Sequence, residues 1–283
     1  MSPRGETAPQ GPTPAATTLF MDAATHTGQG RKLAGTFLAA CLIAALGVGV
    51  GRWTARARPS TSAIPGVVRI VDHDADPVHE HPNDPIWSRF WASVDQPVRD
   101  TNPVTRRVFE WAAVQPGMSV AEIGAGGGYY TVRFARMVGL AGRVWATDID
   151  PRMVRKVAWE RRSRELFQIV PVEVTEGYLG LPSESVDLMT FIDVGAFRTC
   201  EPARNEGYVD QAAAALRRGG RLLVENEYAE DSPQRAGVAS ADCQNLSPDA
   251  IVALVSRRFT LVRREALTQG EGWRGFILLF EKR

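Results

Sequence analysis

The pattern of apolar positions between residues 98 and 283 predicts an α/β fold. Short apolar runs of strand length occupy 120–123, 143–147, 167–174, 188–193 and 218–224. Stretches with apolar residues three and four apart separate these runs, as expected of amphipathic helices. Two further strand patterns, 259–265 and 276–280, flank a glycine-containing turn. Alternating strands and helices are typical of a parallel sheet covered by helices, and the last two strands predict an antiparallel hairpin.

The first 97 residues follow a different pattern. Residues 1–30 are rich in Pro, Gly, Thr and Ala without apolar periodicity, which is typical of a disordered tail. An uncharged, mostly apolar run, 33–51, follows Arg31 and Lys32. This run reaches the lower limit for a bilayer-spanning helix, about 17 residues. We therefore predict a transmembrane or signal-anchor segment at 31–52, a linker and entry segment at 53–97, and a folded α/β domain at 98–283.

The sequence leaves the processing of this membrane segment open. A signal peptide with a cleavage site near residues 54–57 and a lipoprotein box ending at Cys41 are alternatives to an uncleaved anchor. The apolar run continues past Cys41, which favours the anchor. Arginines 52, 56 and 58 favour a cytoplasmic domain by the positive-inside rule. We predict a single-pass anchor with the domain on the cytoplasmic side, and an exported, periplasmic domain as the alternative.

Charge and metal-binding residue types narrow the possible partners. The net charge of +1 supplies no electrostatic attraction to nucleic acid, and none is expected as a partner. Cys200 and Cys243 can pair only if the fold brings them together. Three of the four histidines, His73, His79 and His81, lie among carboxylates and prolines, but their spacing matches no metal-ligand template. We predict no metal site.

The most informative stretch is 118–150, which predicts a strand, a glycine turn, a helix and a second strand. The turn contains Ala125 and four glycines, Gly124, Gly126, Gly127 and Gly128. Glycine adopts positive φ at no steric cost and lets a ligand approach the backbone closely. A glycine turn between a buried strand and a helix N-terminus is a common nucleotide pocket.

The residues around the turn indicate which nucleotide it binds. The turn lacks the third glycine of a dinucleotide-binding fingerprint and the lysine of a phosphate-binding loop. Glu122, just before the glycines, would repel a phosphate but suits a ligand with a cationic amine or sulfonium. Asp148 ends the next strand, where it can accept hydrogen bonds from two ribose hydroxyls. Together these features predict a site for S-adenosylmethionine.

Residues 122–128 with Asp148 resemble the class I S-adenosylmethionine-dependent methyltransferases. The sequence of residues 115–130 is most similar to the isoaspartyl-methyltransferase-like branch and to bacterial methyltransferase-domain proteins with a leading hydrophobic segment. The resemblance implies a Rossmann-like, doubly wound sheet of seven strands in the order 3-2-1-4-5-7-6, ending in an antiparallel hairpin. Pro171 in the third strand agrees with a place at the sheet edge. The cofactor-binding residues implied are Glu122, Gly124, Ala125, Gly126, Gly128, Asp148, Ile149, Glu176 and Asp193, with Glu176 the nearest candidate for reading adenine.

The acceptor side of the reaction is less clearly marked. Asp193, Glu225 and Tyr129 lie at the ligand-binding edge and are candidates for a general base. Related sequences often have a His pair just after the fourth strand, whereas residues 195–198 read Gly-Ala-Phe-Arg here. We predict a methyltransferase acting on a small molecule, lipid or protein. The alternative is a non-catalytic S-adenosylmethionine-binding sensor or scaffold. An oxidoreductase is disfavoured by the missing glycine.

Overall fold

The computed structural model describes residues 64–71, 97–227, 243–269 and 273–283. All of them belong to one structural unit, Arg56–Arg283. The predicted tail, the membrane segment at 31–52 and the three clustered histidines lie outside the described residues. In the described ranges, no helix has the length and apolarity needed to cross a membrane, and no group of His, Cys, Asp and Glu is arranged to hold a metal ion.

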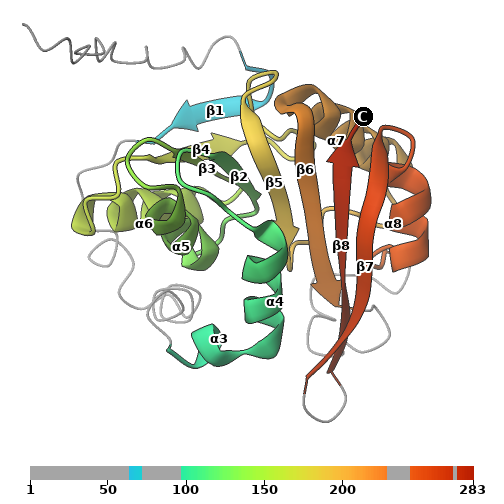
Figure 1. The fold of residues 1–283 in the computed structure, drawn as a ribbon. Coiled ribbons are helices and arrows are strands. Elements are labelled where there is room, and N and C mark those ends of the chain that lie inside the picture. Colours follow the sequence, from blue (N-terminus) through green and yellow to red (C-terminus); the bar gives the residue numbers. More distant parts are fainter. Residues whose placement is uncertain (1–63, 72–96, 228–242, 270–272) are drawn as a thin grey trace, which may run out of the picture. The chain divides into compact units, whose positions relative to one another are not determined.

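Strands and helices alternate along the chain as the periodicity predicts (Figure 1). The strands are β1 (Val67–Ile70), β2 (Ser119–Ile123), β3 (Arg143–Asp148), β4 (Ile169–Val174), β5 (Val186–Ile192), β6 (Leu216–Glu227), β7 (Phe259–Gln269) and β8 (Trp273–Lys282). The helices are α3 (Pro97–Thr101), α4 (Pro103–Ala112), α5 (Tyr129–Val138), α6 (Pro151–Ser163), α7 (Pro202–Ala215) and α8 (Pro248–Val255).

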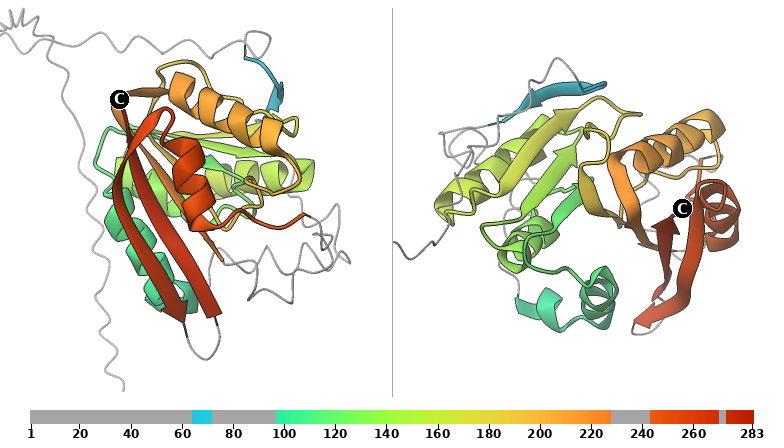
Figure 2. Two further views of the ribbon diagram at one scale, coloured as in Figure 1. Left: turned by 90° about the vertical axis from the view of Figure 1, so that its right-hand side faces the viewer. Right: turned by 45° about the horizontal axis from the view of Figure 1, so that its top comes forward.

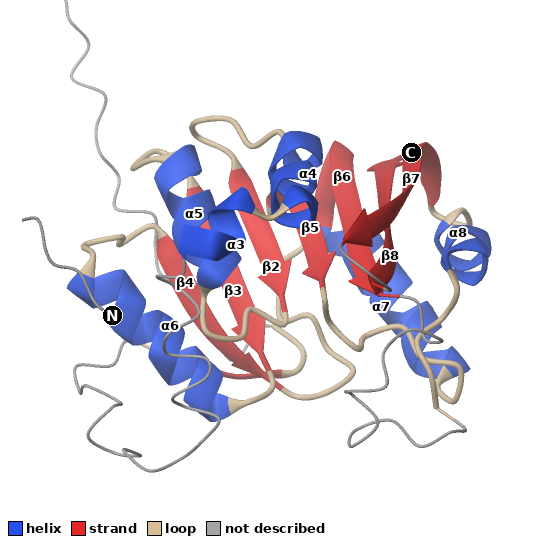
Figure 3. Cartoon of the chain, turned by 90° about the horizontal axis from the view of Figure 1, so that it is seen from below, coloured by secondary structure: helices blue, strands red, loops and turns tan. Residues whose placement is uncertain are grey.

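All the described strands form a single mixed sheet, and β2 to β8 are seen side by side in Figure 3. Its order is β1-β4-β3-β2-β5-β6-β8-β7. Neighbours from β4 to β6 pair in parallel, and β8 runs antiparallel to both β6 and β7. Without β1, this is the predicted order of seven strands, and the C-terminal hairpin is confirmed.

Strand β1 is a correction to the predicted sheet. It lies within the predicted linker, 53–97, and pairs antiparallel with β4, so the sheet has eight strands and β4 is not its edge. The edge position predicted for Pro171 is therefore wrong. The carbonyl of Pro171 accepts a hydrogen bond of 3.0 Å from the N–H of Val71, just past the end of β1. The nitrogen of Pro171 faces the same side, where the pairing with β1 has ended. Pro171 is tolerated because no ladder hydrogen bond is required from its nitrogen there.

Two apolar layers sandwich the sheet, as a doubly wound fold requires. On one face, β2 to β6 pack against α7 and α8 through residues such as Tyr208, Ala212 and Ile251. On the other face they pack against α4, α5 and α6, with Val108, Phe134 and Val157 buried. Figure 2 shows two further views of these helices and of the long β7–β8 hairpin.

Capping hydrogen bonds mark the starts of three helices. The side chains of Asn102, Asp150 and Ser247 each accept from a backbone N–H of the following turn, and each precedes a proline in the first turn of its helix. Helix α7 begins at Pro202. Its N-cap, Glu201, makes no side-chain capping bond, so the usual start signal is missing.

Candidate functional site

The glycine turn is held against the end of β3. The N–H groups of Gly124 and Ala125 both donate to the carbonyl of Thr147, at 2.8 and 3.0 Å. Gly124, Gly126 and Gly128 have φ values of 71°, 53° and 89°, a region that residues with a Cβ rarely adopt. A Cβ on Gly124 would also lie 2.5 Å from the Cγ2 atom of Val194. The turn therefore requires glycine for its backbone and for its close packing.

Asp148 lies beside this turn, as predicted. Its Oδ2 accepts from the N–H of Gly126 at 2.8 Å, and its Oδ1 accepts from the N–H of Asp150 at 2.9 Å. Burial raises the pKa of the Asp148 carboxyl, and these two N–H groups lower it. An ionised carboxylate offers about four acceptor positions. Acceptor positions therefore remain for neighbouring hydroxyls, so the group fits a ribose.

Glu122 is the buried acid of the site. Glu122 lies in β2, which pairs with β3 on one side and β5 on the other, and only 3% of its surface is exposed. The hydroxyl of Thr131 donates to its Oε2. Burial raises the pKa of the Glu122 carboxyl to about 8, with the bond from Thr131 acting to lower it and the charge of Asp148 acting to raise it. Glu122 is therefore mostly neutral at pH 7, and a cation beside it would favour the ionised form.

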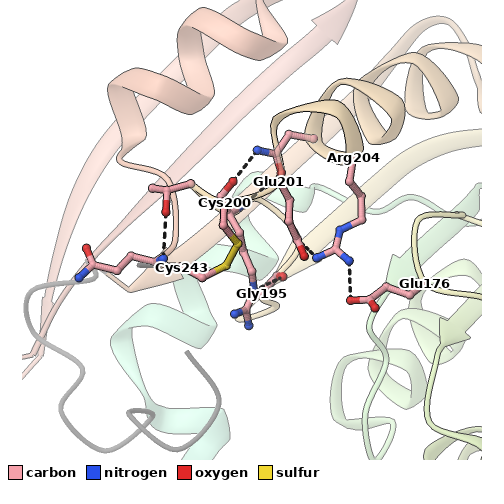
Figure 4. Close-up of a disulfide and its surroundings, with 10 residues drawn as sticks. Glu176, Gly195, Cys200, Glu201, Arg204 and Cys243 are labelled. Atoms are coloured by element: carbon pink, nitrogen blue, oxygen red, sulfur yellow. Dashed lines mark hydrogen bonds and ion pairs between the residues drawn. A yellow bond between two sulfur atoms is a disulfide. The ribbon is translucent and has the colours of Figure 1, made fainter. Parts of the chain in front are cut away.

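Exposure sets Ile149 and Glu176 apart from the buried acid. Ile149 is 56% exposed next to Asp148, so its side chain offers an apolar surface at this edge. Glu176 forms an ion pair of 2.7 Å with Arg204 of α7 (Figure 4), and its side chain is 59% exposed. Among the described residues, Glu176 makes no hydrogen bond or ion pair with the glycine turn, and its role in reading adenine stays a prediction.

Helix α3 lies against the start of α5, a contact that the sequence pattern did not indicate. The Tyr129 hydroxyl donates to Oδ1 of Asp100 at 2.6 Å, and Nε of Arg133 donates to the same oxygen at 2.7 Å. The Tyr129 ring lies between two guanidinium groups, with the Cζ of Arg99 at 3.9 Å from its centroid and that of Arg133 at 3.7 Å. Burial and the bond to Asp100 raise the pKa of Tyr129 to about 12. A phenol that holds its proton this tightly is a poor general base.

The ends of β5 and β6 bring Asp193 and Glu225 to the same edge. Asp193 is exposed, has a φ of 52° and donates its N–H to the Glu225 carbonyl at 3.0 Å. A non-glycine residue with positive φ at a strand end is a feature that clusters at functional sites. Glu225 is 4% exposed. Burial raises the pKa of the Tyr130 phenol, and the charge of Glu225 acts in the same direction.

The departure at 195–198 has a structural explanation. Phe197 is buried, with its ring centroid 5.1 Å from that of Phe191. The Arg198 side chain bonds back to the carbonyl of Gly195. This segment therefore contributes an apolar anchor to the core where related sequences often place histidines.

A second segment, 243–246, is fastened to the chain that follows β5. Cys200 and Cys243 form a disulfide, shown in Figure 4, with their Cα atoms 4.9 Å apart. Backbone bonds connect Thr199 with Gln244 and Phe197 with Leu246. Asn226, at the end of β6, donates to the Val194 carbonyl at 3.1 Å and accepts from Asn245 at 3.3 Å. The pairing left open in the sequence is therefore made, and it joins two segments at the carboxyl end of the sheet.

Comparisons with known proteins agree with this geometry. Residues 120–220 match the family model described as a methyltransferase domain. A ubiquinone/menaquinone biosynthesis C-methyltransferase, UbiE, from Bordetella parapertussis is 36% identical over 118 residues, which are 40% of this chain and 42% of the relative. UbiE from Ralstonia pickettii is 32% identical over 118 residues, or 40% of this chain and 44% of the relative. The chain thus spans less than half the length of the curated relatives it matches.

Solved structures share the fold at low sequence identity. A SAM dependent methyltransferase from Aquifex aeolicus has a TM-score of 0.53 at 16% identity, covering 74% of this chain and 100% of that one. The N-methyltransferase NodS from Bradyrhizobium japonicum WM9, in complex with S-adenosyl-L-homocysteine, has a TM-score of 0.51 at 16% identity, covering 70% and 99%. Residues 120–220 thus match a methyltransferase domain, and the described chain shares the fold of solved S-adenosylmethionine-dependent methyltransferases.

Proposed function

We propose that this protein transfers a methyl group from S-adenosylmethionine to an acceptor bound at the carboxyl end of the sheet. The observation that carries the proposal is the pairing of Asp148 with the turn. Its carboxylate is fixed by the N–H of Gly126 and retains acceptor positions for a ribose. Buried Glu122 lies at the other end of the turn, where a cationic amine would find a carboxylate.

The residues of the chain have distinct roles in this proposal. S-adenosylmethionine supplies, when bound, a methyl group made electrophilic by the sulfonium. The glycines allow the nucleoside to approach the backbone, Asp148 holds the ribose, and Glu122 faces the amine of the methionine end. The protein then needs to position a nucleophile and exclude water, so much of the rate enhancement comes from orientation.

A general base is needed when the nucleophile carries a proton at the working pH. Glu225 is the best of the three candidates, because it is a buried carboxyl near the end of β6, where its carbonyl accepts the N–H of Asp193. Tyr129 is less suitable, because its hydroxyl already donates a hydrogen bond to Asp100. Asp193 is exposed to solvent and lies in a strained loop, which suits contact with the acceptor more than proton transfer.

Calorimetric titration of the full chain with S-adenosylmethionine tests the cofactor, and methyl transfer from labelled cofactor into fractionated small molecules, lipids and proteins tests the reaction. Binding together with labelling of one fraction supports the proposal. The Glu225→Gln variant should bind the cofactor like the wild type and transfer methyl groups at least about a hundredfold more slowly. Absence of binding by the wild type would refute the proposal. Binding without transfer to any fraction would favour a sensor or scaffold instead.

The acceptor is proposed only as a class. The curated relatives are named as C-methyltransferases of quinone biosynthesis. The matched residues make up 40% of this chain, so the acceptor of these relatives is not assigned to this protein. A lipophilic acceptor is the most economical choice if residues 33–51 anchor the protein in a membrane. We propose that anchor on the length of the apolar run, with the domain on the cytoplasmic side where the cofactor is made. Sedimentation of the full chain with membranes, and release by deletion of 33–51, would test it.

A further inference from the structure

The segment 243–246 is joined to the chain that follows β5 by one covalent bond and by backbone hydrogen bonds. The covalent bond is the disulfide between Cys200 and Cys243 (Figure 4). Beside it, the N–H of Thr199 donates to the Gln244 carbonyl at 2.8 Å, and the N–H of Gln244 donates to the Thr199 hydroxyl at 3.0 Å. Both residues are exposed, so water competes for these bonds and each contributes little. The disulfide is therefore the strongest link between the two segments.

The other side of the disulfide, 194–200, has anchors of its own. Phe197 is 3% exposed, with its ring centroid 5.1 Å from that of Phe191. The Asn205 side chain, in α7, accepts from the N–H of Arg198 at 3.1 Å and donates to the carbonyl of the same residue at 2.7 Å. When the disulfide is open, 194–200 keeps these anchors, whereas the partner segment loses its covalent one.

Residues 243–246 lie beside the proposed general base. The side chain of Asn245 donates to Oδ1 of Asn226 at 3.3 Å. Asn226 is 4% exposed and directly follows Glu225 near the end of β6. An acceptor that reaches the Glu225 carboxyl therefore comes close to this segment.

The cofactor side is held together without either cysteine. The glycine turn packs against Val194, because a Cβ on Gly124 would lie 2.5 Å from its Cγ2 atom. The side chain of Asn226 donates to the Val194 carbonyl at 3.1 Å, and the N–H of Asp193 donates to the Glu225 carbonyl at 3.0 Å. These bonds connect the ends of β5 and β6 directly. The turn therefore keeps its neighbour whether the cysteines are paired or free.

The disulfide is open to thiol exchange, because Cys200 is exposed and Cys243 is half-buried. A dithiol reductant would open it in two steps. Its first thiolate attacks one sulfur, forms a mixed disulfide and releases the other cysteine, which takes up a proton. Its second thiolate then displaces the first cysteine, which is protonated in turn. The protein gains two electrons and two protons, and the reductant leaves as a disulfide.

We propose that the Cys200–Cys243 disulfide is a thiol-sensitive switch on acceptor binding. In the paired form, 243–246 is fixed beside Glu225 and the acceptor binds. In the reduced form, the segment is released from 194–200 and acceptor binding weakens, while S-adenosylmethionine binds as before. The inference rests on the proposed function and adds regulation of the same site.

Methyl transfer by the full chain in its two redox forms tests the switch. Labelled S-adenosylmethionine and serial dilutions of the fraction that the wild type labels give a maximal rate and a half-saturating amount. Dithiothreitol should raise the half-saturating amount about tenfold, as expected if the released segment is in its ordered position about a tenth of the time. Calorimetry should find the affinity for S-adenosylmethionine unchanged within about twofold.

Cysteine variants separate this disulfide from other effects of the reductant. The double variant Cys200→Ser/Cys243→Ser should behave like the reduced wild type with and without dithiothreitol. Cys41→Ser is the matched control and should keep the full response. In the wild type, reduction should speed amide hydrogen exchange at Gln244 and leave exchange at Gly124 unchanged.

Two results would overturn the switch. The first is an equal half-saturating amount in the two redox forms. The second is a parallel loss of affinity for S-adenosylmethionine and for the acceptor, which would make the disulfide a general support of the fold. If the wild type neither binds the cofactor nor labels any fraction, the proposed function itself fails, and this inference fails with it. Binding and labelling that ignore the reductant would refute the switch alone.

Discussion

Replacing Glu122 by glutamine should stabilise the protein while weakening its hold on the cofactor. Glutamine has nearly the same shape and can accept the same bond from Thr131, but it cannot ionise. The wild-type carboxyl is 3% exposed, and burial raises its pKa from 4.5 to about 8. The substitution therefore removes a group that the fold holds in its neutral form.

The magnitude follows from proton linkage. Between the unfolded pKa of 4.5 and the folded value of about 8, the folded chain retains a proton that the unfolded chain releases. The free energy of unfolding therefore falls as the pH rises through this window. At pH 7 the loss amounts to about 3 kcal/mol. Glu122→Gln should recover up to about that amount at pH 7, and the difference from the wild type should vanish below about pH 4.

Urea unfolding of both proteins from pH 5 to 8, without cofactor, measures this difference. Glu206→Gln is the control, because the Glu206 side chain is 55% exposed on α7 and carries only a surface ion pair with Arg257. That variant should follow the wild-type pH dependence. If Glu122→Gln also runs parallel to the wild type across this range, the carboxyl ionises in the folded protein at an ordinary pH and the reasoning is wrong.

Cofactor binding should show the opposite sign. At pH 7 a carboxyl with a pKa of about 8 is about 90% protonated, so pairing it with an ammonium group releases about 0.9 proton per site. Titrations in buffers with different enthalpies of ionisation count these protons. The glutamine variant should release none and bind more weakly. A wild-type value near zero would show that Glu122 does not meet the amine.

Three other substitutions test the ribose contact, the turn and the disulfide. Asp148→Ala should weaken S-adenosylmethionine binding at least about tenfold by calorimetry, and unchanged affinity would place the ribose elsewhere. Gly124→Ala combines a φ of 71° with a Cβ 2.5 Å from Val194, so we expect a loss of about 2 kcal/mol or more in urea unfolding; wild-type stability would mean that the turn can relax. Serine at both Cys200 and Cys243 should cost up to about 4 kcal/mol for a loop with a sequence separation of 43, and a reductant should then destabilise only the wild type.

The parts of the fold that the sequence predicts correctly are those encoded locally. Apolar periodicity located β2 to β6, and α4, α6 and α8 each begin at a local cap-proline pair. Strand β1 was missed because only four residues form it and their burial does not alternate simply. Its pairing with β4 is a long-range contact that no local pattern encodes.

The candidate site divides in the same way. The spacing of the glycines and Asp148 predicted their proximity, because the ends of adjacent parallel strands meet at one sheet edge. Nothing in the sequence connects Arg99 and Asp100 with Tyr129, since a five-residue helix has no clear periodicity. The cysteine pair was ambiguous for a related reason, because its spacing matches no motif and only the fold brings the two residues together.

The disulfide between Cys200 and Cys243 closes a covalent loop of the chain between β5 and α8, and this loop contains α7 and β6. Disulfides persist where the surroundings oxidise thiols and are rare in a reducing cytosol. If residues 33–51 anchor the protein as proposed, the oxidation state of this one pair in intact cells would report the side of the membrane on which the domain resides. Paired cysteines would imply that the cofactor must be delivered to an exported enzyme. Two alkylatable thiols would place the enzyme beside its cofactor supply, with its acceptor-side segments held by hydrogen bonds alone.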